Sequence, residues 1–419
     1  MAVYFANKIP RQPGACTAVS WSGHAATSAR APAMCAVAYS SGSLGVYTEE
    51  GDDVTASRPV RSDAPGVYPC ALAWHPRSPL LAVGWTDGRV ALWSGTELRV
   101  SGEETSTHAG RSITCIAWSP TGHRVVTGDD AGKTQVWTVD DKLRPKPTGF
   151  RCAKPAPGAR TSHVVIPNDA AVDEEGAEPD RFLFYYAVNE GLADSGYVCV
   201  GMDTAVDAGG GESKASKAES KATAASRKIF DSPTAIHAAL YHDGVGNLVT
   251  LGTDSVLSIF APPKGDSIGG GGPEGTQSKW TVVSSTKLPT EGDAELTWTE
   301  PGVLAVVNDR DPSCAVRVFD LNTGDNYVLV PPARRKSQGL PKGSDGRDTA
   351  GGDPTGRRLS CLCYDADAKT LACGQRDGRV VMFRRTAPPR GRAGRRAGGT
   401  GGGDEGKRGG EKAGGEEAG

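Results

Sequence analysis

Cys70-Ala71-Leu72-Ala73-Trp74-His75-Pro76, followed by Val90-Ala91-Leu92-Trp93, is the stretch that decides the fold. An apolar strand pattern runs to an aromatic residue, and a second aromatic residue closes the unit some twenty residues later. The same plan returns from Ile113-Thr114-Cys115-Ile116-Ala117-Trp118 to Gln135-Val136-Trp137. A unit that repeats in this way buries its apolar face only by stacking on its neighbours.

Seven copies of the unit can be read along the chain. The closing aromatics of the first three, Tyr47, Trp93 and Trp137, stand 46 and 44 residues apart. A WD-type propeller blade takes roughly 40–45 residues. The pattern therefore predicts an all-β fold, a seven-bladed WD-repeat-type β-propeller. Its blades are expected from Cys16 to Tyr47, Cys70 to Trp93, Ile113 to Trp137, His163 to Met202, Ala235 to Phe260, Glu295 to Asp320 and Leu359 to Phe383.

One apolar strand lies outside these copies. Ala2-Val3-Tyr4-Phe5 precedes the first blade, whereas only a loop-like sequence follows Phe383. We predict that this N-terminal strand becomes the outer strand of the seventh blade. Such pairing joins both ends of the chain in one sheet and leaves no gap in the ring.

Polar, glycine-rich stretches widen the later copies. Residues 204–228, 261–279 and 333–357 lack the apolar side chains that offset the entropy of ordering, and are predicted to be disordered inserts within a propeller domain of residues 1–385. Residues 386–419 are predicted to be a disordered low-complexity tail. The arginines of this tail, beginning at Arg390, could form a nuclear-import signal or a patch that binds acidic partners. The alternative is a solvated flexible end with no such role.

Composition narrows the class of protein. The 419 residues carry a formal net charge of −2, so no strong field favours nucleic acid or an anionic membrane. No apolar run reaches the length of a membrane span, and the first residues lack the pattern of a secretory signal. The ten cysteines lie mostly in apolar strand patterns, which indicates buried thiols in a reducing compartment.

The sequence matches motifs of catalysis and metal binding only incompletely. Gly128-Asp129-Asp130-Ala131-Gly132-Lys133-Thr134 has three residues where a P-loop needs four, so it is interpreted as a hairpin turn. Cys361, Cys363 and Cys373 could gather three thiols, but core packing is the favoured interpretation over zinc. His75 is expected to cap a turn. We predict no catalytic residue, no cofactor, no metal and no enzyme activity.

Trp85 is the candidate partner-binding residue. This aromatic side chain directly precedes the Asp87-Gly88 hairpin turn, where an exposed ring could meet another protein. The alternative is that Trp85 packs between blades.

The closing Trp-Asp dipeptide of WD repeats is absent. Its positions hold Trp93-Ser94 and Trp137-Thr138, and Phe319-Asp320 comes nearest. We therefore expect the buried Asp–His network of such repeats to be missing from most blades.

In order along residues 1–385, the chain resembles the intraflagellar transport protein 140 family. The resemblance is carried by Met1-Ala2-Val3-Tyr4-Phe5, by Ala73-Trp74-His75-Pro76 with Leu80-Leu81-Ala82-Val83-Gly84-Trp85-Thr86-Asp87-Gly88, by Trp118-Ser119-Pro120-Thr121-Gly122 with Thr127-Gly128-Asp129, by Gly324-Asp325-Asn326-Tyr327-Val328-Leu329, and by Leu359-Ser360-Cys361-Leu362-Cys363-Tyr364 through Asp377-Gly378-Arg379-Val380 to Met382-Phe383.

This resemblance implies a non-catalytic interaction scaffold, a subunit of intraflagellar transport complex A. It implies roles in retrograde ciliary transport, cilium assembly and ciliary membrane-protein trafficking. Its partners would be other complex A subunits and ciliary cargo adaptors, with no nucleic acid and no direct membrane insertion. Its location would be the cilium or flagellum, the basal body and the cytoplasm.

Members of that family have two N-terminal propellers and a helical-repeat arm, whereas the present sequence holds one propeller pattern. A fragment, an incomplete gene model and a short paralogue all remain open. The alternative function is a WD-repeat adaptor in a ubiquitin-ligase or chromatin complex.

Overall fold

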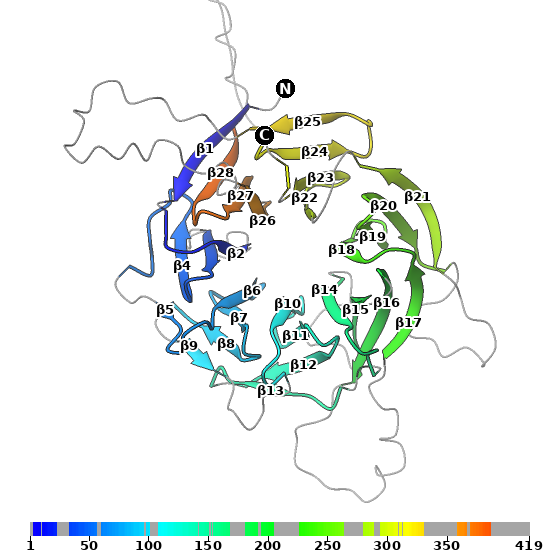
Figure 1. Cartoon of the computed structure of the whole chain (residues 1–419), viewed down its shortest axis with the longest axis horizontal. Coiled ribbons are helices and arrows are strands. Elements are labelled where there is room, and N and C mark those ends of the chain that lie inside the picture. Colours follow the sequence, from blue (N-terminus) through cyan, green and yellow to red (C-terminus); the bar gives the residue numbers. More distant parts are fainter. Residues whose placement is uncertain are drawn as a thin grey trace, which may run out of the picture.

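The computed structural model shows seven four-stranded antiparallel sheets arranged radially around a central axis (Figure 1). The described part of the chain contains no helix, and hence none that could span a bilayer. The predicted all-β seven-bladed propeller is thereby confirmed. The structure describes residues 3–9, 11–22, 33–56, 60–95, 98–100, 108–140, 142–150, 152, 154–167, 181–191, 194–204, 226–263, 280–288, 294–308, 310–311, 313–330, 358–366 and 369–386.

The strands of each blade follow one another from the axis outward, apart from the last blade. Blade 1 contains β2 (Cys16–Trp21), β3 (Met34–Tyr39), β4 (Ser43–Thr48) and β5 (Val60–Arg61). Blade 2 contains β6 (Pro69–Trp74), β7 (Leu81–Trp85), β8 (Val90–Trp93) and β9 (Leu98–Val100). Blade 3 contains β10 (Ile113–Trp118), β11 (Arg124–Asp129), β12 (Thr134–Val139) and β13 (Pro145–Pro147).

The remaining blades keep this order. Blade 4 contains β14 (Arg160–Val165), β15 (Arg181–Glu190), β16 (Ser195–Thr204) and β17 (Ser226–Ser232). Blade 5 contains β18 (Ile236–His242), β19 (Asn247–Gly252), β20 (Val256–Ala261) and β21 (Thr281–Lys287). Blade 6 contains β22 (Ala294–Glu300), β23 (Val303–Asn308), β24 (Val316–Asp320) and β25 (Asn326–Leu329). Blade 7 contains β26 (Leu359–Asp365), β27 (Thr370–Gln375), β28 (Val380–Thr386) and β1 (Val3–Ile9).

The core lies between the blades. Each of the middle strands buries both faces, and in β7 every residue from Leu81 to Trp85 is buried. Because successive side chains point to opposite faces of a strand, one blade gives alternate residues to each of its two neighbours. Seven apolar clusters result, and each joins one blade to the next.

The tryptophan that ends an innermost strand bonds to the preceding blade, which explains why the repeat carries an aromatic residue at this position. The indole Nε1 of Trp74 donates to Ser20 O of blade 1 at 3.0 Å, and that of Trp118 donates to Ala73 O of blade 2 at 2.9 Å. The rings are buried in the same interfaces. These tryptophans therefore combine apolar burial with a directed bond to the preceding blade.

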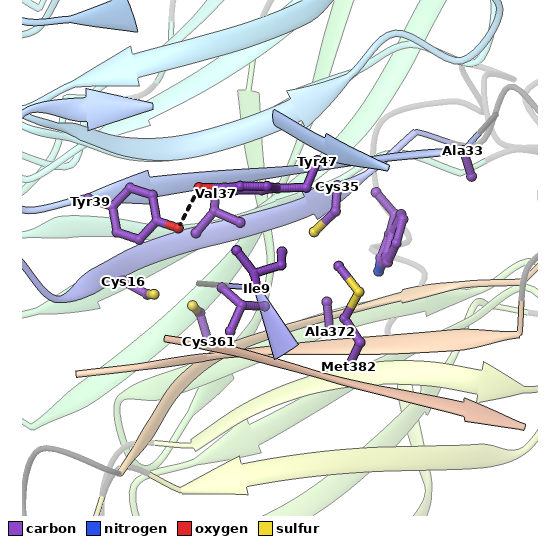
Figure 2. Close-up of a cluster of buried hydrophobic side chains, with 12 residues drawn as sticks. Ile9, Cys16, Ala33, Cys35, Val37, Tyr39, Tyr47, Cys361, Ala372 and Met382 are labelled. Atoms are coloured by element: carbon purple, nitrogen blue, oxygen red, sulfur yellow. Dashed lines mark hydrogen bonds between the residues drawn. The ribbon is translucent and has the colours of Figure 1, made fainter. Parts of the chain in front are cut away.

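The N-terminal strand closes the ring as predicted. Strand β1 pairs antiparallel with β28 over seven residues, from Val3 opposite Thr386 to Ile9 opposite Val380, and lies outside it in blade 7 (Figure 1). Ile9 is 2 % exposed and packs between blades 7 and 1. Figure 2 shows its side chain in this cluster with Val37, Cys361 and Met382.

The predicted inserts and tail fall almost entirely outside the described residues. At their edges, β16 runs to Thr204, β17 begins at Ser226, and β28 ends at Thr386. Tight turns between strands agree with the sequence, since Gly88 and Gly378 have φ angles of +89° and +81°. A side chain at either position would be strained.

Blade 3 carries a complete buried polar network. His108 Nδ1 lies 2.7 Å from Asp129 Oδ2, and His108 Nε2 lies 2.8 Å from Thr127 Oγ1. The indole Nε1 of Trp137 donates to the same hydroxyl at 2.8 Å. Burial of Asp129 opposes its ionisation, but the bonds from His108 and from the backbone N–H of Lys133 outweigh this effect and lower the pKa of the carboxyl. An Asp–His network is thus present in this blade.

Deleting residues 1–8 should lower the melting temperature by at least about 5 °C. Each ladder hydrogen bond contributes about 0.5–1.5 kcal/mol, and their loss also opens the ring between blades 7 and 1. Thermal unfolding followed by circular dichroism measures the change. A truncated protein that melts within a degree or two of the intact chain would contradict closure by β1.

His108→Ala should destabilise the protein by about 2–4 kcal/mol, because it leaves the buried Asp129 and Thr127 without their shared partner. Denaturant unfolding measures the loss. His123→Ala is the matched control, since His123 is an exposed residue of the same blade. Equal stability of the two variants would show that the network contributes nothing.

Candidate functional site at the mouth of the central channel

The innermost strands share a β-bulge near their start. It occurs in six of the seven, all of which lie in the described part of the chain. A bulge leaves one residue unpaired and re-aims its side chain. The bulged residues are Thr17, Cys70, Thr114, Ser162, His237 and Ser360.

Most of these side chains reach the next blade, and we call this set of contacts the interblade ring. Hydroxyl and thiol groups donate to backbone carbonyls of the neighbouring innermost strand, so blades 1, 2, 3 and 7 each help to fix the position of the next blade. The bonds run from Thr17 Oγ1 to Pro69 O at 2.7 Å, from Cys70 Sγ to Ile113 O at 2.9 Å, from Thr114 Oγ1 to Thr161 O, and from Ser360 Oγ to Cys16 O at 3.0 Å.

Blade 4 makes its contact in another way. Asn189, at the end of β15, donates from Nδ2 to Ile236 O at 2.9 Å and accepts from Ile236 N at 2.7 Å. The amide side chain thus imitates a paired strand and joins blade 4 to blade 5. Ser162 keeps its bulge position but donates to Ala187 O within its own blade at 3.4 Å.

Blade 6 departs from the pattern at Glu295. Glu295 stands three residues before Trp298, whereas the bulged residues of blades 1, 2, 3, 5 and 7 stand four residues before an aromatic residue. With one residue fewer, β22 pairs regularly at Glu295 opposite Val307, and its irregularity falls between Trp298 and Glu300 instead. A carboxylate therefore occupies the place of a small hydroxyl, and its Oε2 accepts from Leu362 N of blade 7 at 3.3 Å.

The ring borders a cavity of about 420 Å³ inside the channel. Residues from the innermost strands of blades 3 to 7 line it. These strands surround the central axis (Figure 1). Its ionisable side chains are Arg160 and His163 from β14, His237 from β18, Glu295 from β22, and Arg376 just after β27.

Confinement in the channel shifts the ionisation of Glu295. The side chain is accessible from the channel, yet protein surrounds it, and the resulting loss of solvation raises the pKa of the carboxyl to about 7. The hydrogen bond from Leu362 opposes the shift without cancelling it. Glu295 therefore changes charge near neutral pH.

His163 experiences the opposite effect. Burial, together with the positive charge of Arg160 and the proximity of His237, lowers the pKa of its imidazole to about 4. His163 is hence neutral at pH 7. In this part of the cavity the positive charge beside His163 is that of Arg160.

The cysteines near the ring are protonated thiols. Burial raises the pKa of Cys16 and of Cys363 to about 12, and also raises that of Cys361 and Cys373. A thiolate is the form that binds metals and attacks electrophiles. The packing interpretation of these thiols agrees with their place between blades 7 and 1 and in the neighbouring cluster.

Trp85 is placed away from the surface. Its side chain is 2 % exposed and packs with Trp74 and Trp93 in the cluster between blades 1 and 2. The guanidinium of Arg89 lies over the ring, 5.7 Å from its centroid. The geometry is that of the packing alternative, and partner binding through Trp85 stays a prediction.

His75 and the Gly128–Thr134 segment have the structural roles that the sequence predicted. His75 Nδ1 accepts from the backbone N–H groups of Arg77 and Ser78, both at 2.9 Å, so it caps a turn. Gly128–Thr134 forms the β11–β12 hairpin turn, closed by Asp129 N donating to Lys133 O at 3.0 Å.

Part of the sequence matches the model of a known protein family. Residues 2–168 match the family model described as IFT140 first beta-propeller. The match spans β1, blades 1 to 3 and the first strand of blade 4, which is less than half of the chain. Together with the seven-bladed ring, it is consistent with the N-terminal propeller of IFT140 and supports the resemblance to this family.

Sequence reasoning missed the interblade ring and Glu295. The signal was present, because a small polar residue stands four positions before the aromatic residue of the innermost strand motif in blades 1, 3 and 7. Nothing in that spacing shows which groups the neighbouring blade presents.

Glu295→Gln should raise the melting temperature at pH 8 and leave it nearly unchanged at pH 5. The folded protein keeps the Glu295 proton up to about pH 7, whereas an unfolded glutamate releases it near pH 4.3. The native state thus binds more protons between these values, and stability falls as pH rises through this window. Gln cannot titrate and retains an acceptor for Leu362 N.

Thermal unfolding of both proteins at pH 5, 6, 7 and 8 provides the measurement. Glu300→Gln is the control, because Glu300 is an exposed residue at the far end of the same strand. A difference between wild type and Glu295→Gln that does not change with pH would contradict the shifted pKa.

Proposed function

We propose that this chain is a non-catalytic interaction scaffold that acts in intraflagellar transport complex A. The observation that carries the proposal is the family match over residues 2–168. In this role the propeller contributes to retrograde ciliary transport, cilium assembly and ciliary membrane-protein trafficking. Its partners are other complex A subunits and ciliary cargo adaptors, and it resides in the cilium or flagellum, the basal body and the cytoplasm.

The contacts in the channel support a scaffold over an enzyme. The hydroxyls of Thr17 and Ser360 donate to backbone carbonyls of the next blade, so neither is directed at a general base. An activated nucleophile needs such a base within hydrogen-bond reach. These two hydroxyls therefore serve the cohesion of the blades.

Co-purification tests the proposal. The tagged full chain, expressed in a ciliated cell, should recover other complex A subunits and localise to cilia and basal bodies. Recovery of a ubiquitin ligase or of histones without ciliary subunits would favour the adaptor alternative and overturn the proposal. A folded Trp85→Ala protein that loses one subunit would support partner binding through Trp85, and retention of all subunits would assign this ring to packing.

A further inference from the structure

The cavity at the channel mouth is asymmetric in charge. On the side formed by blades 4 and 5, Arg160, His163 and His237 line it together. Glu295 lines it from blade 6, and Arg376 from blade 7. The factors that shift the pKa of Glu295 are burial and the Leu362 hydrogen bond, so none of the cationic side chains that the structure describes compensates this carboxyl. Arg160 on β14 is therefore not engaged in neutralising Glu295.

Arg160 and His163 on the blade 4 side have unused hydrogen-bonding capacity toward the other residues that the structure describes. Within the described residues, Arg160 forms no ion pair, although it is close enough to His163 to lower the pKa of that imidazole. The Nδ1 atom of His163 is buried and, among the residues that the structure describes, has no hydrogen-bond partner. A buried polar atom without a partner costs about 1–3 kcal/mol, and such atoms are rare in native proteins.

We propose that this cavity binds an acidic side chain presented by a segment of a partner protein, with the carboxylate held by Arg160 and flanked by His163 and His237. The proposal rests on the scaffold function and adds the chemistry of one contact. A guanidinium binds a carboxylate through paired hydrogen bonds, and imidazole N–H groups can donate to the same oxygens.

A single carboxylate fits the cavity better than a polyphosphate. Glu295 lies in the same cavity and, when ionised, repels a ligand that carries several negative charges. A peptide carries one negative charge per acidic residue. Its backbone N–H groups can also donate hydrogen bonds to the carboxyl oxygens of Glu295. The side chains of Ser162 and Asn189, which can form hydrogen bonds, also line the cavity from blade 4. The volume of about 420 Å³ accommodates a short segment.

The test uses the purified full chain and a capped hexapeptide that contains two glutamates among glycines. Its affinity is measured by NMR titration and compared with that of the same peptide carrying glutamines. We expect the glutamate peptide to bind at least fivefold more tightly, and Arg160→Gln to abolish the difference. Arg227→Gln is the matched control, because Arg227 is an exposed arginine on the outer strand β17 of the same blade.

A second measurement needs no substitution. The pKa of His163, followed by its ring proton resonances in the wild-type protein, should rise when the glutamate peptide is added and stay unchanged with the glutamine peptide. Equal affinity of the two peptides, or an unchanged His163 in the presence of the glutamate peptide, would overturn the proposal. Tighter binding of inorganic phosphate than of the peptide, lost in Arg160→Gln, would also overturn it.

The outcome is separable from that of the proposed function. If the wild-type chain recovers complex A subunits but does not discriminate between the peptides, the scaffold function stands and the acidic-ligand site is wrong. If it discriminates between the peptides but recovers no complex A subunit from ciliated cells, the site stands and the proposed function is wrong.

Discussion

Burial of one blade against the next is the constraint on which the rest of this structure depends. Every blade contributes alternate side chains to two interfaces, and a blade outside the ring would expose apolar surface on both faces. The ring must therefore close, and the pairing of β1 with β28 makes one sheet from both ends of the chain. Ile9 adds a side chain to the interface between blades 7 and 1 (Figure 2).

The hydrogen bonds of the interblade ring fix the orientation of neighbouring blades that pack through apolar side chains. Hydrophobic burial fixes how closely two blades approach but tolerates small rotations, whereas a side chain bonded to a backbone carbonyl of the next strand does not. The bonds of Thr17 and Ser360 act at the axis, where the blades are nearest to one another. The bonds of Trp74 and Trp118 act at the other end of the innermost strands. Each interface with both kinds of bond is held at two points.

Much of the fold could be predicted from the repeat, because the spacing of aromatic residues depends only on strand length and turn length. The closing strand was predictable for the same reason, since Val3–Phe5 had no blade of its own. The site was not predictable. Trp85 was selected for its position before a turn, but its burial depends on Trp74, Trp93 and the side chains of blade 1. The Asp129 network was equally hidden, because His108 lies in a loop 21 residues before Asp129 and only the fold brings the two side chains together.

The sequence by itself determined the architecture: a seven-fold alternation of apolar residues allows radial stacking and little else, and the N-terminal strand supplies the missing edge. Only the tertiary structure decided the chemistry of the channel. Arg160, His237 and Glu295 come from three blades and are separated by more than fifty residues at each step. The raised pKa of Glu295 depends on its burial among these blades and on the backbone of Leu362 in a fourth blade. The solvation of a charged group and its Coulomb interactions depend on distances in space. Separations along the chain do not give these distances.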